Sequence, residues 1–228
     1  MTLSISELRA AGRADLSGRW GESAMLTFVY FVIVSILQGA CSAATLLWAP
    51  GLGEGLIGLL LIPMYWGYEM TFLSLHRNQD GDPFDIGHLF DGYTGGRFLR
   101  VFTTIFLCEL LIILGLVLLI IPGIYLALNF ALVPYLIQDN AELRNMSALR
   151  LSHEMMRGHR LRLLGLCLSF LGWILLALLF TLGIGLFWVI PYICASLANF
   201  YEDVKADYEA QMSVTAGTDS EETDHYQK

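Results

Sequence analysis

Residues 101–137 read VFTTIFLCELLIILGLVLLIIPGIYLALNFALVPYLI, two apolar runs that meet at the helix breakers Pro122 and Gly123. The first run, 101–121, has about the 20 residues that a helix needs to cross roughly 30 Å of hydrocarbon. The second run, 123–137, is shorter and begins directly at the break. Because Pro and Gly end or kink a helix, we interpret the stretch as a tight hairpin of two transmembrane helices.

Four more apolar runs lie outside this hairpin, at residues 24–48, 55–75, 163–182 and 186–201. The last two are separated by Gly183-Ile184-Gly185, a second helix-breaking stretch. The chain is 56% hydrophobic and only 15% charged, a composition typical of a protein in a bilayer. The sequence therefore predicts an all-α fold: a polytopic transmembrane bundle of six helices in three hairpins, over residues 1–208.

The basic residues are segregated along the chain, and cytoplasmic loops collect Lys and Arg. The connections around residues 49–54, 121–123 and 183–185 contain none of the thirteen basic residues. Those residues lie before the first helix, between helices two and three, between helices four and five, and in the tail: Arg9, Arg13, Arg19, Arg77, Arg97, Arg100, Arg144, Arg150, Arg157, Arg160, Arg162, Lys205 and Lys228. This pattern predicts that both termini are cytoplasmic.

The cytoplasmic segments have helix signals of their own. Ser4-Ile5-Ser6-Glu7 has the spacing of a capping box, and Leu8, Gly12 and Leu16 fall with Ile5 on one side of the helix it would start. Asp82-Pro83-Phe84-Asp85 is typical of an N-cap followed by Pro at the first helical position. We expect amphipathic helices that lie at the membrane interface.

The densest basic cluster lies in residues 140–162. A helix over 140–157 would place Ala148, Leu149, Leu151, Met155 and Met156 on one face and polar groups on the other. We expect four arginines of this cluster to contact anionic lipid headgroups at the cytoplasmic face: Arg150, Arg157, Arg160 and Arg162.

The tail carries most of the net charge of −8. From Glu202 to Lys228 there are eight acids and two lysines, which gives −6. Beyond residue 208 the chain is acidic and has no apolar period, so we expect residues 209–228 to be a disordered cytoplasmic tail.

Glu69 and Glu109 are the ionisable residues within the apolar runs. An acid within a membrane is costly unless it is paired or hydrated, and it is therefore a functional candidate. Glu69 and Glu109 could form a proton or cation site, with Asn129 as a polar neighbour. Alternatively, both acids lie near enough to the interface to be tolerated by hydrogen bonding or protonation.

Other chemistry finds little support in the sequence. Asp80, Asp82, Asp85, His88 and Asp91 do not have the spacing of an EF-hand, because the turn glycine and the terminal glutamate are missing. The four cysteines lie within apolar runs and form no CxxC motif. No P-loop, GxSxG, HExxH or GxGxxG context occurs. We expect no catalytic residues, no bound metal, no cofactor and no nucleic-acid partner.

Several motifs in the C-terminal half resemble a known family. They are SHEMMRGH at 152–159, LSFLGW at 168–173, TLGIGL at 181–186, VIPY at 189–192 and FYED at 200–203. With LSGRW at 16–20 and IPGI at 121–124, they are similar to a family of uncharacterised bacterial integral membrane proteins, domain of unknown function nine-seven-five. The resemblance covers roughly residues 5–205.

The resemblance implies a six-helix hydrophobic domain in the bacterial inner membrane. This family is distantly similar to the membrane domain of glycerophosphodiester phosphodiesterases, which lacks catalytic residues itself. The leading hypothesis is a non-enzymatic membrane protein that engages anionic lipid or a membrane-protein partner, including a second copy of itself. The alternative is a small transporter or channel that uses Glu69 and Glu109.

Overall fold

The computed structural model describes the backbone of residues 2–46, 49, 52–77 and 83–225, and the side chains of these residues except 52, 54 and 214–225. The described chain is mostly helical and contains no strand. The elements are α1 (Ile5–Asp15), α2 (Trp20–Thr45), α3 (Leu52–His76), η1 (Ile86–Tyr93), α4 (Phe98–Leu118), α5 (Ile120–Phe130), α6 (Val133–Asp139), α7 (Met146–Met155), α8 (Arg160–Thr181) and α9 (Leu186–His225).

Five helices are long and apolar enough to cross a membrane, in the part of the chain that is described. They span Trp20–Thr45, Gly55–His76, Phe98–Leu118, Ile120–Asp139 and Arg160–Thr181. The expected sixth crossing, 186–201, is not among them. Its apolar run is followed at once by Glu202 and Asp203, so a window of transmembrane length includes both charges. The sixth crossing stays a prediction.

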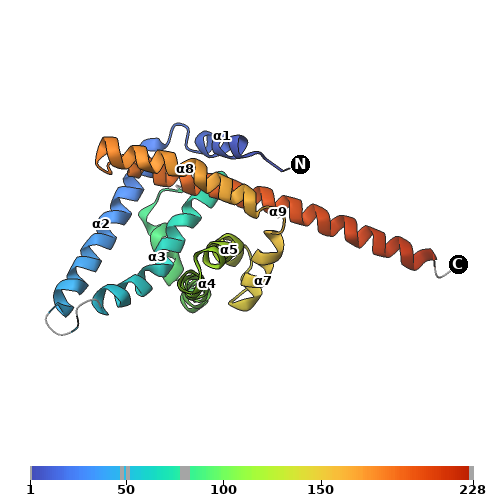
Figure 1. Cartoon of the computed structure of the whole chain (residues 1–228), viewed down its shortest axis with the longest axis horizontal. Helices are drawn as coiled ribbons and strands as arrows, with labels where there is room; N and C mark the ends of the chain where they lie inside the picture. The colour runs from blue at the N-terminus through green and yellow to red at the C-terminus, as the bar shows by residue number, and fades with distance from the viewer. Residues whose placement is uncertain (1, 47–48, 50–51, 78–82, 226–228) are drawn as a thin grey trace.

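The helices do not form a row of parallel hairpins. In Figure 1, α8 and α9 run together across the top, α2 and α3 form a V below them, and α4 and α5 are seen nearly end-on. Consecutive helices still pack as the hairpins require, because α2 packs against α3, α4 against α5, and α8 against α9. These contacts are between neighbours in the sequence, and the arrangement of six helices in three hairpins stays a prediction.

Large apolar side chains are exposed along α2, α4 and α8. Val117 at the end of α4, Ile121 at the start of α5 and Leu179 in α8 are 78%, 81% and 76% exposed. In water, exposed apolar surface of this extent would be unfavourable, whereas hydrocarbon is an adequate solvent for it. This surface agrees with a multi-pass membrane protein.

The buried core gathers around α9. Its residues Ala195, Ala198, Phe200, Tyr201 and Val204 have no measurable exposure. Helices α1, α2, α3, α7 and α8 all contact α9. Small residues permit the closest approach: a Cβ on Gly12 of α1 would lie 2.9 Å from the backbone nitrogen of Ser196 in α9. The first and last helices of the chain are thus packed backbone to backbone.

Two helices predicted outside the apolar runs are present. The capping box at α1 has both of its hydrogen bonds, with Ser4 N–H donating to Glu7 at 2.7 Å. The predicted apolar side of α1 faces protein, since Leu8, Gly12 and Leu16 are buried. Helix α7 begins at Met146, six residues later than predicted, and its apolar face is likewise buried, as Ala148 and Leu149 show.

Three boundaries differ from expectation. The fourth predicted helix is divided into α5 and α6, because Pro134 stands at the first turn of a new helix, whereas Pro63 and Pro191 lie inside α3 and α9. The N-cap before η1 is Asp85, whose side chain accepts from Gly87 N–H. The proposed cap Asp82 lies outside the described residues.

The third difference is at the C-terminus. Helix α9 continues through the residues expected to be disordered, as far as His225. At its start this extension has contacts that favour the helix: Tyr208 packs against the core, and Gln211 donates to Asp207 one turn earlier at 2.8 Å.

Candidate functional site

Glu69 lies in the interior of the protein, on α3. Its side chain is 8% exposed, and Tyr65, one turn earlier on the same helix, is hydrogen-bonded to its carboxyl group. The second oxygen, Oε2, is buried and has no hydrogen-bond partner among the described residues. Nearly all buried polar atoms in proteins have a hydrogen-bond partner, so this oxygen is an exception.

The other two residues of the predicted intramembrane site lie elsewhere. Glu109 is exposed on α4. Asn129 is fully buried near the end of α5, where its amide donates to Tyr125 O at 2.7 Å and its Oδ1 accepts from Arg160 Nε at 2.7 Å. In the described structure no hydrogen bond or ion pair links Glu69, Glu109 and Asn129, so they have separate surroundings.

The four arginines expected to contact lipid divide into two pairs. Arg160 donates to Asn129 and stacks over the Tyr125 ring at 4.9 Å, and Arg162 forms an ion pair with Asp203 and stacks over Phe200 at 5.0 Å. These two guanidinium groups hold helices together. In the described chain, the exposed guanidinium groups of Arg150 and Arg157 have no hydrogen bond or ion pair.

Arg150 and Arg157 border a groove between α7 and the α4–α5 hairpin. Its volume is about 240 Å³, and its apolar lining residues include Leu111 and Phe130. The complete lining is Leu111, Phe130, Met146, Leu149, Arg150, His153, Glu154 and Arg157. Two arginines and one glutamate leave the lining with one net positive charge when His153 is neutral. The groove therefore combines apolar lining residues with exposed cationic ones.

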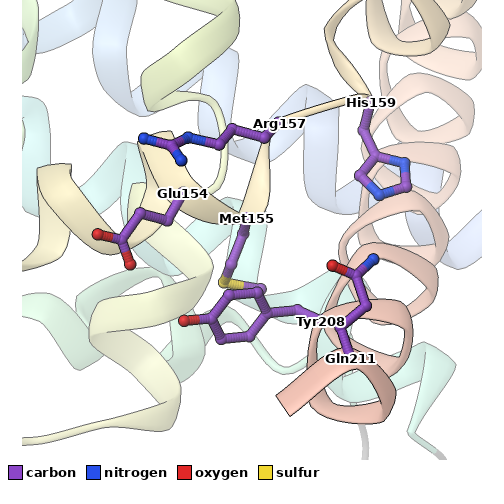
Figure 2. A pocket seen from close by; sticks show the side chains of 6 residues that line it. All are labelled: Glu154, Met155, Arg157, His159, Tyr208 and Gln211. Carbon is purple, nitrogen blue, oxygen red and sulfur yellow. The ribbon is translucent and has the colours of Figure 1, made fainter. Parts of the chain in front are cut away.

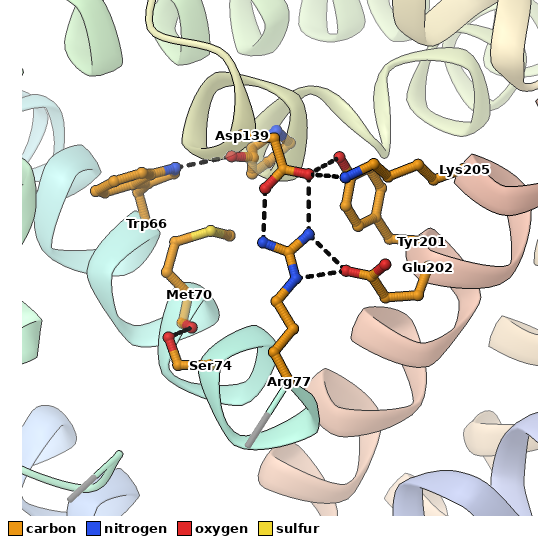
Figure 3. Close-up of polar contacts among 9 residues, drawn as sticks. Trp66, Met70, Ser74, Arg77, Asp139, Tyr201, Glu202 and Lys205 are labelled. Atoms are coloured by element: carbon orange, nitrogen blue, oxygen red, sulfur yellow. Dashed lines mark hydrogen bonds and ion pairs between the residues drawn. The ribbon is translucent and has the colours of Figure 1, made fainter. Parts of the chain in front are cut away.

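A larger ionic network, which the sequence did not indicate, joins the ends of α3 and α6 to the middle of α9 (Figure 3). Arg77, which follows α3, reaches Asp139 at the end of α6 with two hydrogen bonds of 2.7 and 2.9 Å. Its Nε also donates to Glu202 of α9 at 2.6 Å. Asp139 further accepts from Tyr201 at 2.8 Å and Lys205 at 2.6 Å. The pKa of Arg77 is raised above its usual range, mainly by the hydrogen bonds to Asp139 and to a smaller extent by the hydrogen bond to Glu202.

Further polar contacts ring the same part of α9. Asp15 at the end of α1 accepts from Asn199 at 2.6 Å and pairs with His76 at 2.9 Å. Asp203 pairs with Arg162 and accepts from Leu3 N–H at 3.1 Å. One turn later, Asp207 contacts His159 at 3.2 Å. Residues 199–207 of α9 therefore connect α1, α3, α6 and the start of α8 through charged or polar side chains.

Two open pockets lie between α7 and this part of α9. Figure 2 shows Met155 and Tyr208 together at the centre of one, with Arg157 and Glu154 to one side and His159 and Gln211 to the other; its volume is about 250 Å³. The second, of about 290 Å³, is lined by Asp139, Tyr201 and Lys205 together with Tyr208. The ionic network is thus accessible from solvent at Asp139.

The acids in and before η1, whose spacing does not fit an EF-hand, have local contacts. His88 and Asp91 pair with each other at 3.0 Å, and Asp85 caps η1. Asp80 and Asp82 lie outside the described residues. Within the described residues, no group of three or more His, Cys, Asp or Glu side chains could hold a metal ion.

Residues 110–208 match the model of a family described as protein of unknown function, DUF975. The match confirms the family resemblance over this part of the chain, which runs from the second half of α4 into α9 and includes the groove beside α7. No curated protein and no solved structure gives a significant match.

Proposed function

We propose that this chain is a non-enzymatic membrane protein that binds the headgroup of an anionic phospholipid in the groove beside α7. The proposal places it in the bacterial inner membrane with both termini in the cytoplasm, as the segregation of its arginines favours. Of the four arginines expected to contact lipid, it retains Arg150 and Arg157. Arg160 and Arg162 have protein partners instead.

The observation that carries the proposal is the placement of two unpaired guanidinium groups beside an apolar groove. Guanidinium binds phosphate with two parallel hydrogen bonds. Leu111 and Phe130 in the groove lining can accept an acyl chain, and the neighbouring face of α4 continues with exposed Ile113 and Leu114. A ligand that fits both parts is an amphiphilic anion, and a membrane supplies such a molecule at high local concentration.

Lipid binding can be measured with the purified protein in nanodiscs. Native mass spectrometry should show retained phosphatidylglycerol and much less phosphatidylcholine. At about 1 kcal/mol for each basic residue near an anionic surface, the double variant Arg150→Gln/Arg157→Gln should lose about 2 kcal/mol of binding free energy. That loss corresponds to roughly thirtyfold weaker phosphatidylglycerol binding.

The control is Arg13→Gln/Arg97→Gln, which removes two exposed arginines from other cytoplasmic segments. It should leave binding unchanged. Equal binding of the two lipids, or an equal loss in both double variants, would contradict a specific site. Co-purification of a membrane protein that depends on Arg150 and Arg157, without bound lipid, would assign the groove to a protein partner.

The alternative is a transporter or channel that uses Glu69 and Glu109. Among the described residues, no contact links these two acids into one pathway. Glu109 is exposed on α4, whereas Glu69 is buried and surrounded by α2, α6 and α9 side chains. We therefore do not extend the proposal to transport through the pair. The buried acid has a different explanation.

A further inference from the structure

The Glu69 carboxyl group faces side chains from four helices, and none of them is cationic. Tyr65 of α3 is hydrogen-bonded to it. Tyr30 of α2, Tyr135 of α6 and Cys194 of α9 interact with it electrostatically. Within the described residues, no charged or titratable group of η1 or α4 is found among its interactions. Its surroundings are thus hydroxyl, thiol and apolar groups.

A carboxylate in this position would be a buried negative charge without a counter-charge. Desolvation of such an ion costs several kcal/mol, which one hydrogen bond from Tyr65 does not offset. The Oε2 atom points to the same problem, because an ionised oxygen attracts hydrogen-bond donors strongly and the described residues provide none to this atom. A positive charge must therefore come from outside the protein. A metal cation would need several more oxygen ligands than these side chains supply, whereas a proton needs only the carboxyl oxygen.

We propose that Glu69 is a proton-binding site whose occupancy is coupled to the packing of α3, α6 and α9. In the step itself, the carboxylate takes up one proton from water and an O–H bond forms on the carboxyl group. Release returns the proton to water and restores the charge. The protonated acid suits the packed arrangement seen here, in which α6 is held to α3 by Trp66 Nε1 donating to Pro134 O at 2.9 Å (Figure 3).

Two tyrosine side chains lie between this site and an open pocket, and they define a candidate route for protons. The Tyr135 ring, beside Glu69, stacks on the Tyr201 ring with centroids 5.0 Å apart. The Tyr201 hydroxyl donates to Asp139 at 2.8 Å, and Asp139 lines the open pocket between α6, α7 and α9. The route passes from α3 through α6 to α9 and ends in the ionic network around Arg77. It is independent of the lipid groove and of Glu109.

Infrared spectroscopy of the full-length protein in nanodiscs tests the site, because a protonated carboxylic acid has its own C=O stretching band. At about pH 6, where exposed carboxyl groups are ionised, we expect a carboxylic acid band that disappears in Glu69→Gln and persists in Glu109→Gln. The band should be the same in sodium and in choline buffers. Identical spectra of wild type and Glu69→Gln would overturn the proposal, and so would a band that appears only when sodium is removed.

A second variant tests the route. Tyr201→Phe retains the ring stack and removes the hydroxyl that contacts Asp139. After a pH jump, the Glu69 band should change several-fold more slowly than in wild type, with the same final amplitude. Tyr192→Phe is the matched control on α9, because the Tyr192 hydroxyl donates instead to Arg9 O at 3.1 Å. An unchanged rate in Tyr201→Phe, or equal slowing in both variants, would overturn the route through Tyr201.

Discussion

Arg77 and Asp139 form a two-pronged ion pair between the end of α3 and the end of α6: Nη1 donates to Oδ1 at 2.7 Å and Nη2 to Oδ2 at 2.9 Å. The side chains are 24% and 15% exposed, so solvent screens the pair only in part. Since Arg77 also holds Glu202, one guanidinium fixes α6 and α9 relative to α3.

Replacement of Arg77 by Lys should destabilise the protein although the charge is retained. The ammonium group of Lys cannot form both parallel hydrogen bonds to Asp139 and also keep the contact with Glu202. We expect a loss of about 1–2 kcal/mol in the free energy of unfolding, measured by denaturation in detergent micelles. A double-mutant cycle with Asp139→Asn should give a coupling energy of at least about 0.5 kcal/mol. Additive effects would show that the pair contributes no energy of its own.

Gly12→Ala should loosen α1 from α9. The added Cβ would lie 2.9 Å from the Ser196 backbone nitrogen, so a backbone segment must move. Overpacking of this kind costs about 1–3 kcal/mol, which thermal unfolding would detect. The control is Gly39→Ala in α2, where nothing lies within 4 Å of the new Cβ. It should be neutral or slightly stabilising; an equal loss in both variants would contradict the close approach.

Acidification should fray the start of α1. The hydrogen bonds from the backbone N–H of Ser4, and then from its hydroxyl, hold the pKa of Glu7 below its usual range. Its contribution to stability is therefore complete above the usual Glu pKa of about 4.3 and is lost as the pH falls through the lower folded value. Hydrogen exchange at Ser4 to Leu8, corrected for intrinsic rates, should show protection falling between about pH 5 and pH 3. In Glu7→Gln the protection should not depend on pH; the same fall in that variant would exclude Glu7 as the cause.

The topology can be mapped by cysteine labelling in a background without the four native cysteines. A membrane-impermeant reagent should label Glu54→Cys in intact cells. It should label Asp80→Cys, Asn145→Cys and Ser213→Cys only after permeabilisation, because arginine-bearing loops remain inside. Labelling of Ser213→Cys in intact cells would place the C-terminus outside and imply an odd number of crossings.

The helices themselves were predictable because their signals are local. Apolar runs of transmembrane length and the break at Gly183-Ile184-Gly185 lie within a few residues of the boundaries they determine, whereas Pro122 and Gly123 lie inside α5, just after the break at Leu119. The capping box of α1 is equally local, since Ser4 and Glu7 are three residues apart. The division of α5 from α6 was missed, because Pro134 inside an apolar run indicates a kink and a new helix start equally well.

The polar contacts were not predictable, because their partners are distant in the sequence. Arg77 lies 62 residues from Asp139 and 125 from Glu202. Arg77 and Asp139 stand at or beyond a helix end, and Glu202 follows the apolar run of α9; a charged residue needs no special explanation at any of these positions. The sequence predicts lipid contacts for Arg160 and Arg162 only because both lie in a basic cluster. The fold alone brings Asn129 and Asp203 against them. The signal that could have been used was the acidic and amide series Asn199, Glu202, Asp203 and Asp207 at helical spacing on α9.

The position of α9 in the core also constrains how the chain can be made. Leu3 N–H bonds to Asp203 and the Tyr192 hydroxyl to Arg9 O, contacts that span 200 and 183 residues. A ribosome synthesises the N-terminal helices first, at about 5–20 residues per second. Helix α9, which buries α1, α2 and α3, is therefore synthesised many seconds after them. Until the last segment has been synthesised, the earlier helices can be inserted in the bilayer but cannot reach their native packing. A premature stop before α9 would therefore leave inserted helices without a core, a natural substrate for membrane quality-control proteases.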